Sequence, residues 1–280
     1  MATYDYQVIH VSDHAIYQEF INKTTGKNII AFDLEGVRLS RVGRCTIMTV
    51  GILDNYLITS YVIDLLLDDK DLINTAMTYI KNLLEDDNII KIIHDCRSDS
   101  DVLYRHHNIK ITNVFDTSVA QMIYSKKTVR DNLNNTLLYN NCKQNKYRPE
   151  LARDFYKNNP EYWGSRPMTG QMIDHAGSDV LNLHELYDKY RENIDKNLFN
   201  KIKDESTKAV KEYLEMPEHK IIYVHDSKMG RVIGRNGCNL ALIQKNTGAI
   251  IACNTSNGFL VLAPNNNIID LVERMIKSYC

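Results

Sequence analysis

Residues 28–36 read Asn-Ile-Ile-Ala-Phe-Asp-Leu-Glu-Gly, an apolar run that ends in two carboxylates and a glycine. In a β-strand the side chains alternate between two faces, so Asp33 and Glu35 point one way while Phe32 and Leu34 point the other. Two acids on one face at the end of a buried strand repel each other and lose hydration, which a divalent cation with oxygen ligands would relieve. The simpler alternative is a strand that runs out into solvent, and this short motif alone does not exclude it.

The composition is that of an ordinary globular protein. The chain has 280 residues, of which 44% are hydrophobic and 25% charged, enough for one large domain and a small one. The formal net charge is −1, so no overall basic field indicates a nucleic-acid partner. A local basic patch or bound metal ions would have to supply the positive charge instead.

Cysteine spacing and hydropathy indicate in which cellular compartment the protein is expected. The six cysteines contain no Cys-x-x-Cys pair, which disfavours a zinc knuckle or a disulfide framework and favours reduced thiols in an intracellular compartment, either cytoplasm or nucleus. Residues 1–6 lack a basic start followed by an apolar core, so we expect no secretion signal. No apolar run approaches the roughly 20 residues of a membrane helix, so we expect no membrane partner.

The patterns around the first acidic motif predict a mixed α/β sheet. We expect helices at 14–22, behind a Ser12-Asp13 N-cap, and at 71–85, and further strands at 6–11, 43–51, 56–64 and 88–94. Short turns join the first acidic strand to the next two, which predicts an antiparallel meander within the sheet. Residues 126–166 are polar and irregular, with short helical pieces near 131–140 and 149–157. Their cluster of Lys and Arg fits either a solvated surface or a phosphate-facing rim.

Two further groups of polar residues follow predicted elements. Residues 95–101 come directly after a strand and contain three acids, more than capping of a helix by Ser98 or Asp99 would require. A long helix is expected from about 170 to 190, and on it His175 and Asp179 lie one turn apart on the same face. Taken alone, that pair is more typical of a surface contact than of a functional site.

The C-terminal part forms a second unit. Residues 191–217 are charged and predict a helical spacer that ends at Pro217. Beyond it the patterns predict the order strand, helix, helix, strand, strand, helix, with Gly234-Arg235-Asn236-Gly237 between the first two helices. Residues 218–280 carry seven Lys or Arg and four Asp or Glu, a net charge of +3.

Most of residues 5–195 resemble the DEDD superfamily of 3′–5′ exonucleases, in particular the ribonuclease D-like branch that includes the Egalitarian-type proteins. The resemblance lies in Phe-Asp-Leu-Glu-Gly-Val at 32–37, Ile-Ile-His-Asp-Cys-Arg-Ser-Asp at 92–99, Phe-Asp-Thr at 115–117, and Arg-Pro-Met-Thr at 166–169 followed by His175-Ala-Gly-Ser-Asp179-Val180. It implies a ribonuclease H-like mixed sheet with surrounding helices. It also implies that four acids hold two divalent cations, Mg²⁺ or Mn²⁺: Asp33, Glu35, Asp99 and Asp179.

His175 departs from the family pattern. The ribonuclease D branch typically has a tyrosine four residues before the last aspartate, whereas the histidine branch of the superfamily places its histidine five residues before. His175 therefore combines the chemistry of one branch with the spacing of the other. The resemblance implies that its imidazole orients or deprotonates the attacking water.

Residues 218–280 resemble a KH domain of the eukaryotic type, a small α+β fold with the order βααββα. The resemblance implies that the loop Gly234-Arg235-Asn236-Gly237 clamps the backbone of about four single-stranded nucleotides. Its glycines allow close approach to phosphates, the next helix presents N–H groups, and Arg235 adds a cation. We therefore expect an exonuclease domain at 1–195, a charged helical linker at 196–217 and a KH domain at 218–280.

Together these features predict a metal-dependent 3′–5′ exonuclease that releases nucleoside 5′-monophosphates from the 3′ end of a single strand, with the KH domain holding that strand. We expect RNA rather than DNA, because KH modules and this exonuclease branch usually meet RNA. The alternative is a catalytically inactive exonuclease fold that binds RNA as an adaptor. Against it stands the complete acid set, which is costly to keep clustered without a cation.

Overall fold

The computed structural model describes residues 4–147, 155, 158–255 and 258–280. Contacts divide the chain into two units, residues 1–210 and residues 211–280. Of the helical piece expected near 149–157, all but Phe155 falls outside the described residues. None of the described helices combines the length and the apolar character needed to cross a bilayer.

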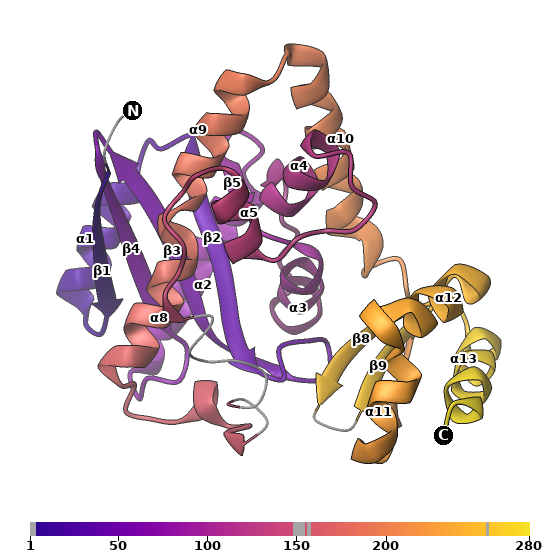
Figure 1. Cartoon of the computed structure of the whole chain (residues 1–280). Helices are drawn as coiled ribbons and strands as arrows, with labels where there is room; N and C mark the ends of the chain where they lie inside the picture. The colour runs from indigo at the N-terminus through magenta and orange to yellow at the C-terminus, as the bar shows by residue number, and fades with distance from the viewer. Residues whose placement is uncertain (1–3, 148–154, 156–157, 256–257) are drawn as a thin grey trace. The chain divides into compact units, whose positions relative to one another are not determined.

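The first unit is built on a six-stranded mixed sheet (Figure 1). Its strands are β1 (Asp5–Val11), β2 (Ile29–Val37), β3 (Arg44–Asp54), β4 (Leu57–Asp64), β5 (Ile90–Ile93) and β6 (Val114–Asp116), in the order β1-β4-β3-β2-β5-β6. β2, β3 and β4 form the predicted antiparallel meander. β1 pairs parallel with β4, and β2, β5 and β6 pair parallel with one another in that order. The predicted mixed α/β class is confirmed.

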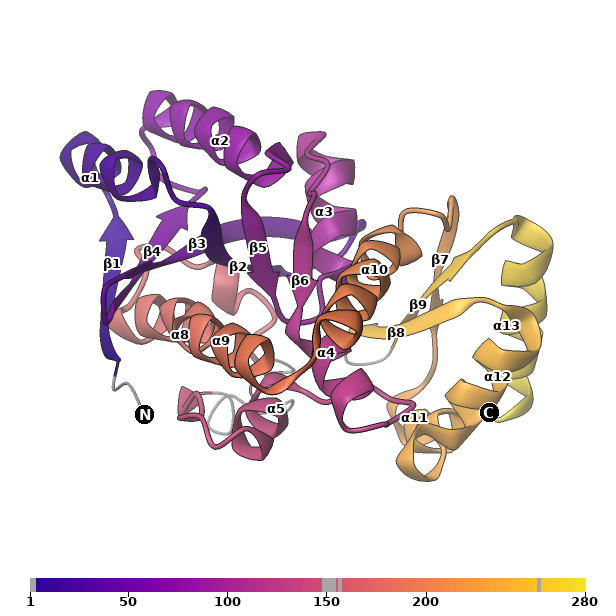
Figure 2. The same cartoon turned by 90° about the horizontal axis from the view of Figure 1, so that it is seen from above.

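Helices cover both faces of this sheet (Figure 2). On one face, α1 (His14–Thr24), α2 (Lys70–Glu85) and α3 (Arg97–His107) enclose a core that contains Ile30, Phe32 and Leu34 of β2. On the other face, Ala31 of β2 packs with residues of α4 (Thr117–Tyr124), α5 (Leu133–Tyr139), α8 (Gly170–Leu181) and α9 (Leu183–Asn193). Since strand side chains alternate, Asp33 and Glu35 share the face of Ala31, on the side of α8.

The structure corrects two expectations about helices. The single helix expected over 170–190 is two helices, because α8 ends at Leu181 and α9 starts at Leu183. Asn182 lies between them with φ −97° and ψ 0°, and its backbone N–H donates to the carbonyl of Val180. Ser98 and Asp99 do not cap α3, which begins at Arg97; its start is fixed instead by contacts from β6 that are described below.

Helix α10 (Lys196–Glu212) occupies the segment expected to be a spacer, and it packs on the first unit. Ile202 and Ala209 are buried in the cores of that unit. The backbone N–H of Asp116 in β6 donates to Ser206 Oγ at 3.0 Å, and the hydroxyl of Ser100 in α3 donates to the Val210 carbonyl at 2.9 Å. Most of this helix therefore belongs structurally to the first unit, while the domain limits at 195 and 217 stay a prediction.

The second unit is a three-stranded antiparallel sheet with three helices. Its elements are β7 (Glu218–Tyr223), α11 (Asp226–Ile233), α12 (Cys238–Thr247), β8 (Ile250–Thr255), β9 (Gly258–Ala263) and α13 (Asn266–Ser278), with the strand order β7-β9-β8. Val232, Ile243, Phe259 and Val272 are fully buried between the helices and the sheet. The predicted order βααββα is confirmed.

Candidate active site and nucleic-acid-binding loop

The acidic end of β2 is shaped by a β-bulge. Glu35 pairs with Ile47 and Gly36 pairs with Cys45, so Thr46 on β3 is the extra residue. A Cβ atom at Gly36 would lie 2.1 Å from the carbonyl oxygen of Arg44, so only glycine fits this close approach of β3. The glycine that follows the two acids therefore sets how the end of β2 meets its neighbour.

Helix α8 brings two more functional groups to the same face. Thr169 caps the helix by accepting from the Met172 N–H, and further along the helix His175 and Asp179 are 3% and 2% exposed. His175 Nε2 lies 3.9 Å from Asp179 Oδ2. Donor atoms of Glu35, His175 and Asp179 all lie within 4.8 Å of one another. The pair on α8 is thus buried beside β2, and the surface alternative is wrong.

Two aromatic rings contact the His175 imidazole. The ring centroid of Trp163 lies 5.1 Å from it and that of Tyr147 lies 5.8 Å from it. Trp163 is buried in the 3₁₀ turn η1 (Tyr162–Gly164), and its carbonyl accepts from Thr46 Oγ1 at 2.8 Å. These contacts restrict the rotation of the imidazole. Sequence reasoning missed both rings, although Trp163 is the only tryptophan of the chain.

The two remaining predicted acids are Asp33 on β2 and Asp99 on α3. Burial raises the pKa of the Cys45 thiol on β3, and the charges of Asp99, Glu35 and Asp33 raise it further. Burial, then the charge of Asp95, raises the pKa of Asp99 to about 7, while the backbone N–H of Leu34 acts in the opposite direction. The structure brings the predicted acids together only in part: Asp179 joins Glu35 and His175 in the donor group, while the carboxylates of Asp33 and Asp99 lie outside it.

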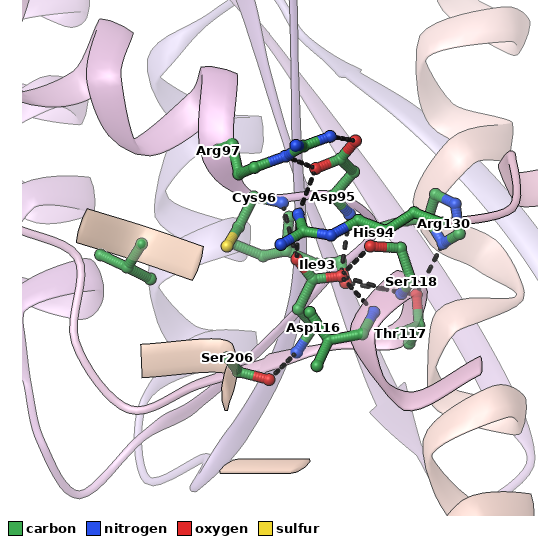
Figure 3. A network of polar contacts seen from close by, with 12 residues as sticks. Ile93, His94, Asp95, Cys96, Arg97, Asp116, Thr117, Ser118, Arg130 and Ser206 are labelled. Atoms are coloured by element: carbon green, nitrogen blue, oxygen red, sulfur yellow. Dashed lines mark hydrogen bonds and ion pairs between the residues drawn. The ribbon is translucent and has the colours of Figure 1, made fainter. Parts of the chain in front are cut away.

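Asp116 fixes the turn at Asp95 and Cys96 (Figure 3), which directly precedes α3, the helix that carries Asp99. Its carboxylate is fully buried and accepts from the backbone N–H groups of Asp95 and Cys96, both at 3.0 Å. The same carboxylate caps α4 by accepting from Ser118 N at 2.8 Å. The sequence predicts that Asp116 and Thr117 open a helix, which α4 confirms, but the contacts of the Asp116 carboxylate with the turn at 95–96 were not predicted.

Two arginines hold the other side of that turn. Asp95 has a left-handed backbone, φ +63°, and its carboxylate accepts from Arg97 Nε at 2.6 Å and from Arg130 Nη1 at 2.8 Å. These ion pairs help keep the pKa of Asp95 below its usual value despite burial, which opposes them. Arg130 belongs to the basic cluster of 126–166, so this member of the cluster serves an internal contact.

The loop of the second unit has the geometry that a backbone-clamping loop requires. Gly234, Asn236 and Gly237 have φ values of +74°, +54° and +77°, a region that glycine and asparagine tolerate best. A Cβ at Gly234 would lie 2.9 Å from the backbone N of Asn239. Arg235 and Asn236 are exposed, and α12 starts at Cys238 without a side-chain cap. The loop therefore presents a cation and backbone N–H groups together.

Comparison with known proteins identifies both units. Residues 8–195 match the family described as 3'-5' exonuclease, and residues 219–271 match the family described as KH domain. The first match covers more than half of the chain. The chain therefore belongs to the 3′–5′ exonuclease family, and it carries a KH domain after the exonuclease domain.

Individual relatives and a solved structure agree with this family assignment. The chain is 30% identical to the human piRNA biogenesis protein EXD1 over 156 residues, which are 52% of this chain and 29% of that protein. It is 28% identical to ribonuclease D of Granulibacter bethesdensis over 137 residues, 48% of this chain and 30% of the relative. The matches thus span less than a third of these relatives. The structure of Trypanosoma brucei RNase D has a TM-score of 0.62 at 19% identity, with 76% of this chain and 73% of that chain covered, which shows the fold.

Proposed function

We propose that this protein is a metal-dependent 3′–5′ exoribonuclease that removes nucleoside 5′-monophosphates one at a time from a single strand. The observation that carries this proposal is the group of half-buried Glu35 and buried His175 and Asp179, whose donor atoms lie within 4.8 Å of one another at the strand that also bears Asp33. Acids gathered in this way lose solvation and repel one another unless a cation compensates them.

The donor set fits divalent cations, because carboxylate oxygens are the ligands that Mg²⁺ and Mn²⁺ prefer. Asp33, Glu35, Asp99 and Asp179 would hold two such ions. When bound, a pair of divalent cations supplies charge stabilisation at the attacking and leaving oxygens of a phosphodiester. A solved relative in fold, Brucella melitensis NrnC with bound Mg²⁺, has a TM-score of 0.52 at 18% identity, with 74% of this chain and 90% of that chain covered.

His175 is suited to the proton transfer. Its Nε2 faces Asp179 and would accept the proton of the attacking water, while the rings of Trp163 and Tyr147 keep the imidazole in place. In this role His175 takes the position that a tyrosine holds in the ribonuclease D branch.

RNA is the substrate that the comparisons favour. The relatives include ribonucleases D, one structural neighbour is Trypanosoma brucei RNase D in complex with RNA U12, and KH modules bind single strands through their glycine loop. We also place the protein inside the cell, in the cytoplasm or nucleus, where buried thiols such as Cys45, Cys96 and Cys142 stay reduced.

The test uses the full chain and 5′-labelled single strands of RNA and DNA with one sequence. Wild-type protein with Mg²⁺ or Mn²⁺ should shorten the RNA from its 3′ end to a ladder, and EDTA or the Asp33→Asn substitution should abolish the ladder. An intact but shifted RNA band with Mn²⁺ would establish the adaptor function instead. Equal digestion by Asp33→Asn would show that the site is assigned wrongly, and preferential digestion of DNA would overturn the choice of RNA.

A further inference from the structure

Asn145 is a buried residue that no sequence motif singled out and that contacts the candidate site. It lies in the polar segment between α5 and Tyr147, and it is 3% exposed. Its Nδ2 donates a hydrogen bond of 2.6 Å to Oδ1 of Asp179, 34 residues away in the chain. The other oxygen of Asp179, Oδ2, is the one that lies 3.9 Å from His175 Nε2.

The direction of the Asn145 amide is fixed by a second contact. The backbone N–H of Tyr147 can only donate, and it donates to Asn145 Oδ1 at 2.9 Å. The amide group must therefore turn its NH₂ toward Asp179. An asparagine at this position acts as a donor to the carboxylate and as an acceptor to its own segment at the same time.

The segment that carries Asn145 is anchored on both sides. Asn134 on α5 bonds both backbone groups of Asn145, with Asn145 N donating to Asn134 Oδ1 at 3.0 Å and Asn134 Nδ2 donating to the Asn145 carbonyl at 2.9 Å. Five residues earlier, the carbonyl of Asn140 accepts from Lys189 Nζ at 2.7 Å. The donor is therefore held in place by α5 and α9 before any ligand binds.

From this geometry we propose that Asn145 is a positioning residue for the reaction: it holds Asp179 by Oδ1 so that Oδ2 faces His175 and Glu35. The inference rests on the proposed function of the site. A neutral amide orients the carboxylate without cancelling its charge, whereas a lysine or arginine at 145 would compete with a cation for Asp179. Hydrogen-bond partners of ligating carboxylates typically change metal affinity or activity by about 10- to 100-fold when they are removed.

The test compares Asn145→Ala and Asn145→Leu with wild type by Mn²⁺ titration calorimetry of the full chain without RNA. Leucine matches the branched outline of asparagine, so it carries the test if the alanine variant does not fold. We expect Mn²⁺ to bind about 10- to 100-fold more weakly. In the exonuclease assay, kcat should fall at low Mn²⁺ and recover at high Mn²⁺, while KM for the oligonucleotide stays within about threefold.

The matched control is Asn134→Ala, which removes the two bonds to the backbone of Asn145 and leaves its amide in place. It should lower the denaturation midpoint of the metal-free protein and weaken Mn²⁺ binding clearly less than the Asn145 substitutions do, because the amide that bonds Asp179 is still present. Equal losses of Mn²⁺ affinity in the Asn134 and Asn145 variants, or unchanged affinity in the latter, would overturn the proposal. If wild type binds Mn²⁺ but leaves RNA intact, the nuclease proposal fails while the calorimetric comparison still decides the role of Asn145.

Discussion

Gly177 on α8 lies so close to Val8 on β1 that a Cβ at position 177 would come within 2.5 Å of Cγ1 of the valine. Gly177 stands between His175 and Asp179 in the sequence, so this contact sets how near both functional side chains come to the sheet. We expect Gly177→Ala to destabilise the protein by about 1–3 kcal/mol through overpacking. It should also lower kcat, because the helix must shift to make room. Urea unfolding and the exonuclease assay measure the two effects.

Two controls accompany this prediction. Gly170 begins the same helix, and a Cβ atom added there would meet no neighbouring atom within 4 Å, so Gly170→Ala should leave activity unchanged. Val8→Ala removes the two methyl groups that collide, and in the Gly177→Ala background it should restore activity. If the double variant is as inactive as Gly177→Ala, the loss does not arise from the contact with Val8.

Asp99 makes the stability of the metal-free protein depend on pH. Its pKa is raised by burial to about 7 in the folded chain, so the folded state keeps a proton that the unfolded state releases near pH 4. The stabilisation from this protonated carboxyl is complete below about pH 4 and is lost as pH rises to about 7. In EDTA, Asp99→Asn should therefore be more stable than wild type at pH 8 by a few kcal/mol, because a tenfold change in proton affinity corresponds to roughly 1.4 kcal/mol.

Urea unfolding of wild type and Asp99→Asn at pH 5 and pH 8 checks the direction of this pH dependence of stability. The advantage of Asp99→Asn should grow between the two values, and saturating Mg²⁺ should remove it by stabilising wild type at pH 8. A constant difference at both pH values would contradict the raised pKa.

Removal of the His175 imidazole should slow chemistry more than binding. His175→Ala should lower kcat by about 10²- to 10⁴-fold, the usual contribution of a general base, with the dissociation constant for RNA nearly unchanged. His175→Tyr introduces the residue that the ribonuclease D branch typically has at this spacing, and we expect it to retain more activity than the alanine variant. Single-turnover kinetics measure the rate of the chemical step, and RNA-binding titrations measure the dissociation constant. An alanine variant as fast as wild type would exclude a role for His175 in proton transfer.

The exposed loop of the KH domain should control affinity for longer strands. Changing Arg235 and Asn236 together to aspartate removes a cation and places two anions where phosphates would approach, while Asp tolerates the left-handed φ of position 236. We expect binding of a long single-stranded RNA to weaken about tenfold or more, with a smaller salt dependence. Hydrolysis of a trinucleotide should not change, which separates this effect from damage to the active site. Unchanged binding of the long strand would show that the loop does not contact RNA.

Local patterns predicted most of the elements because these depend on neighbouring residues, whereas the set of four acids came from the resemblance to the exonuclease family. The alternation around Asp33 and Glu35 places both acids on one face of β2, as predicted. His175 and Asp179 lie one helical turn apart on α8, also as predicted. The buried groups that hold these residues were not predictable in this way. Asn145 meets Asp179 across 34 residues, and it lies in a polar segment without periodicity that a pattern could reveal.

Helix α10 is a second case in which local sequence patterns did not predict how a segment packs. Its many charges suggested a solvated spacer, yet Ile202 and Ala209 are buried and Ser206 bonds the backbone of Asp116. A few apolar positions on a charged helix decide its location, and only the packed structure identifies which ones they are.

That helix has a practical consequence for anyone who wishes to excise the exonuclease domain. A fragment cut at residue 195 would lose Ser206, strip the partner from the Asp116 N–H and open the core that Ile202 fills. The smallest self-sufficient nuclease should accordingly extend through Val210, and shorter versions should aggregate or melt early for reasons unrelated to their chemistry.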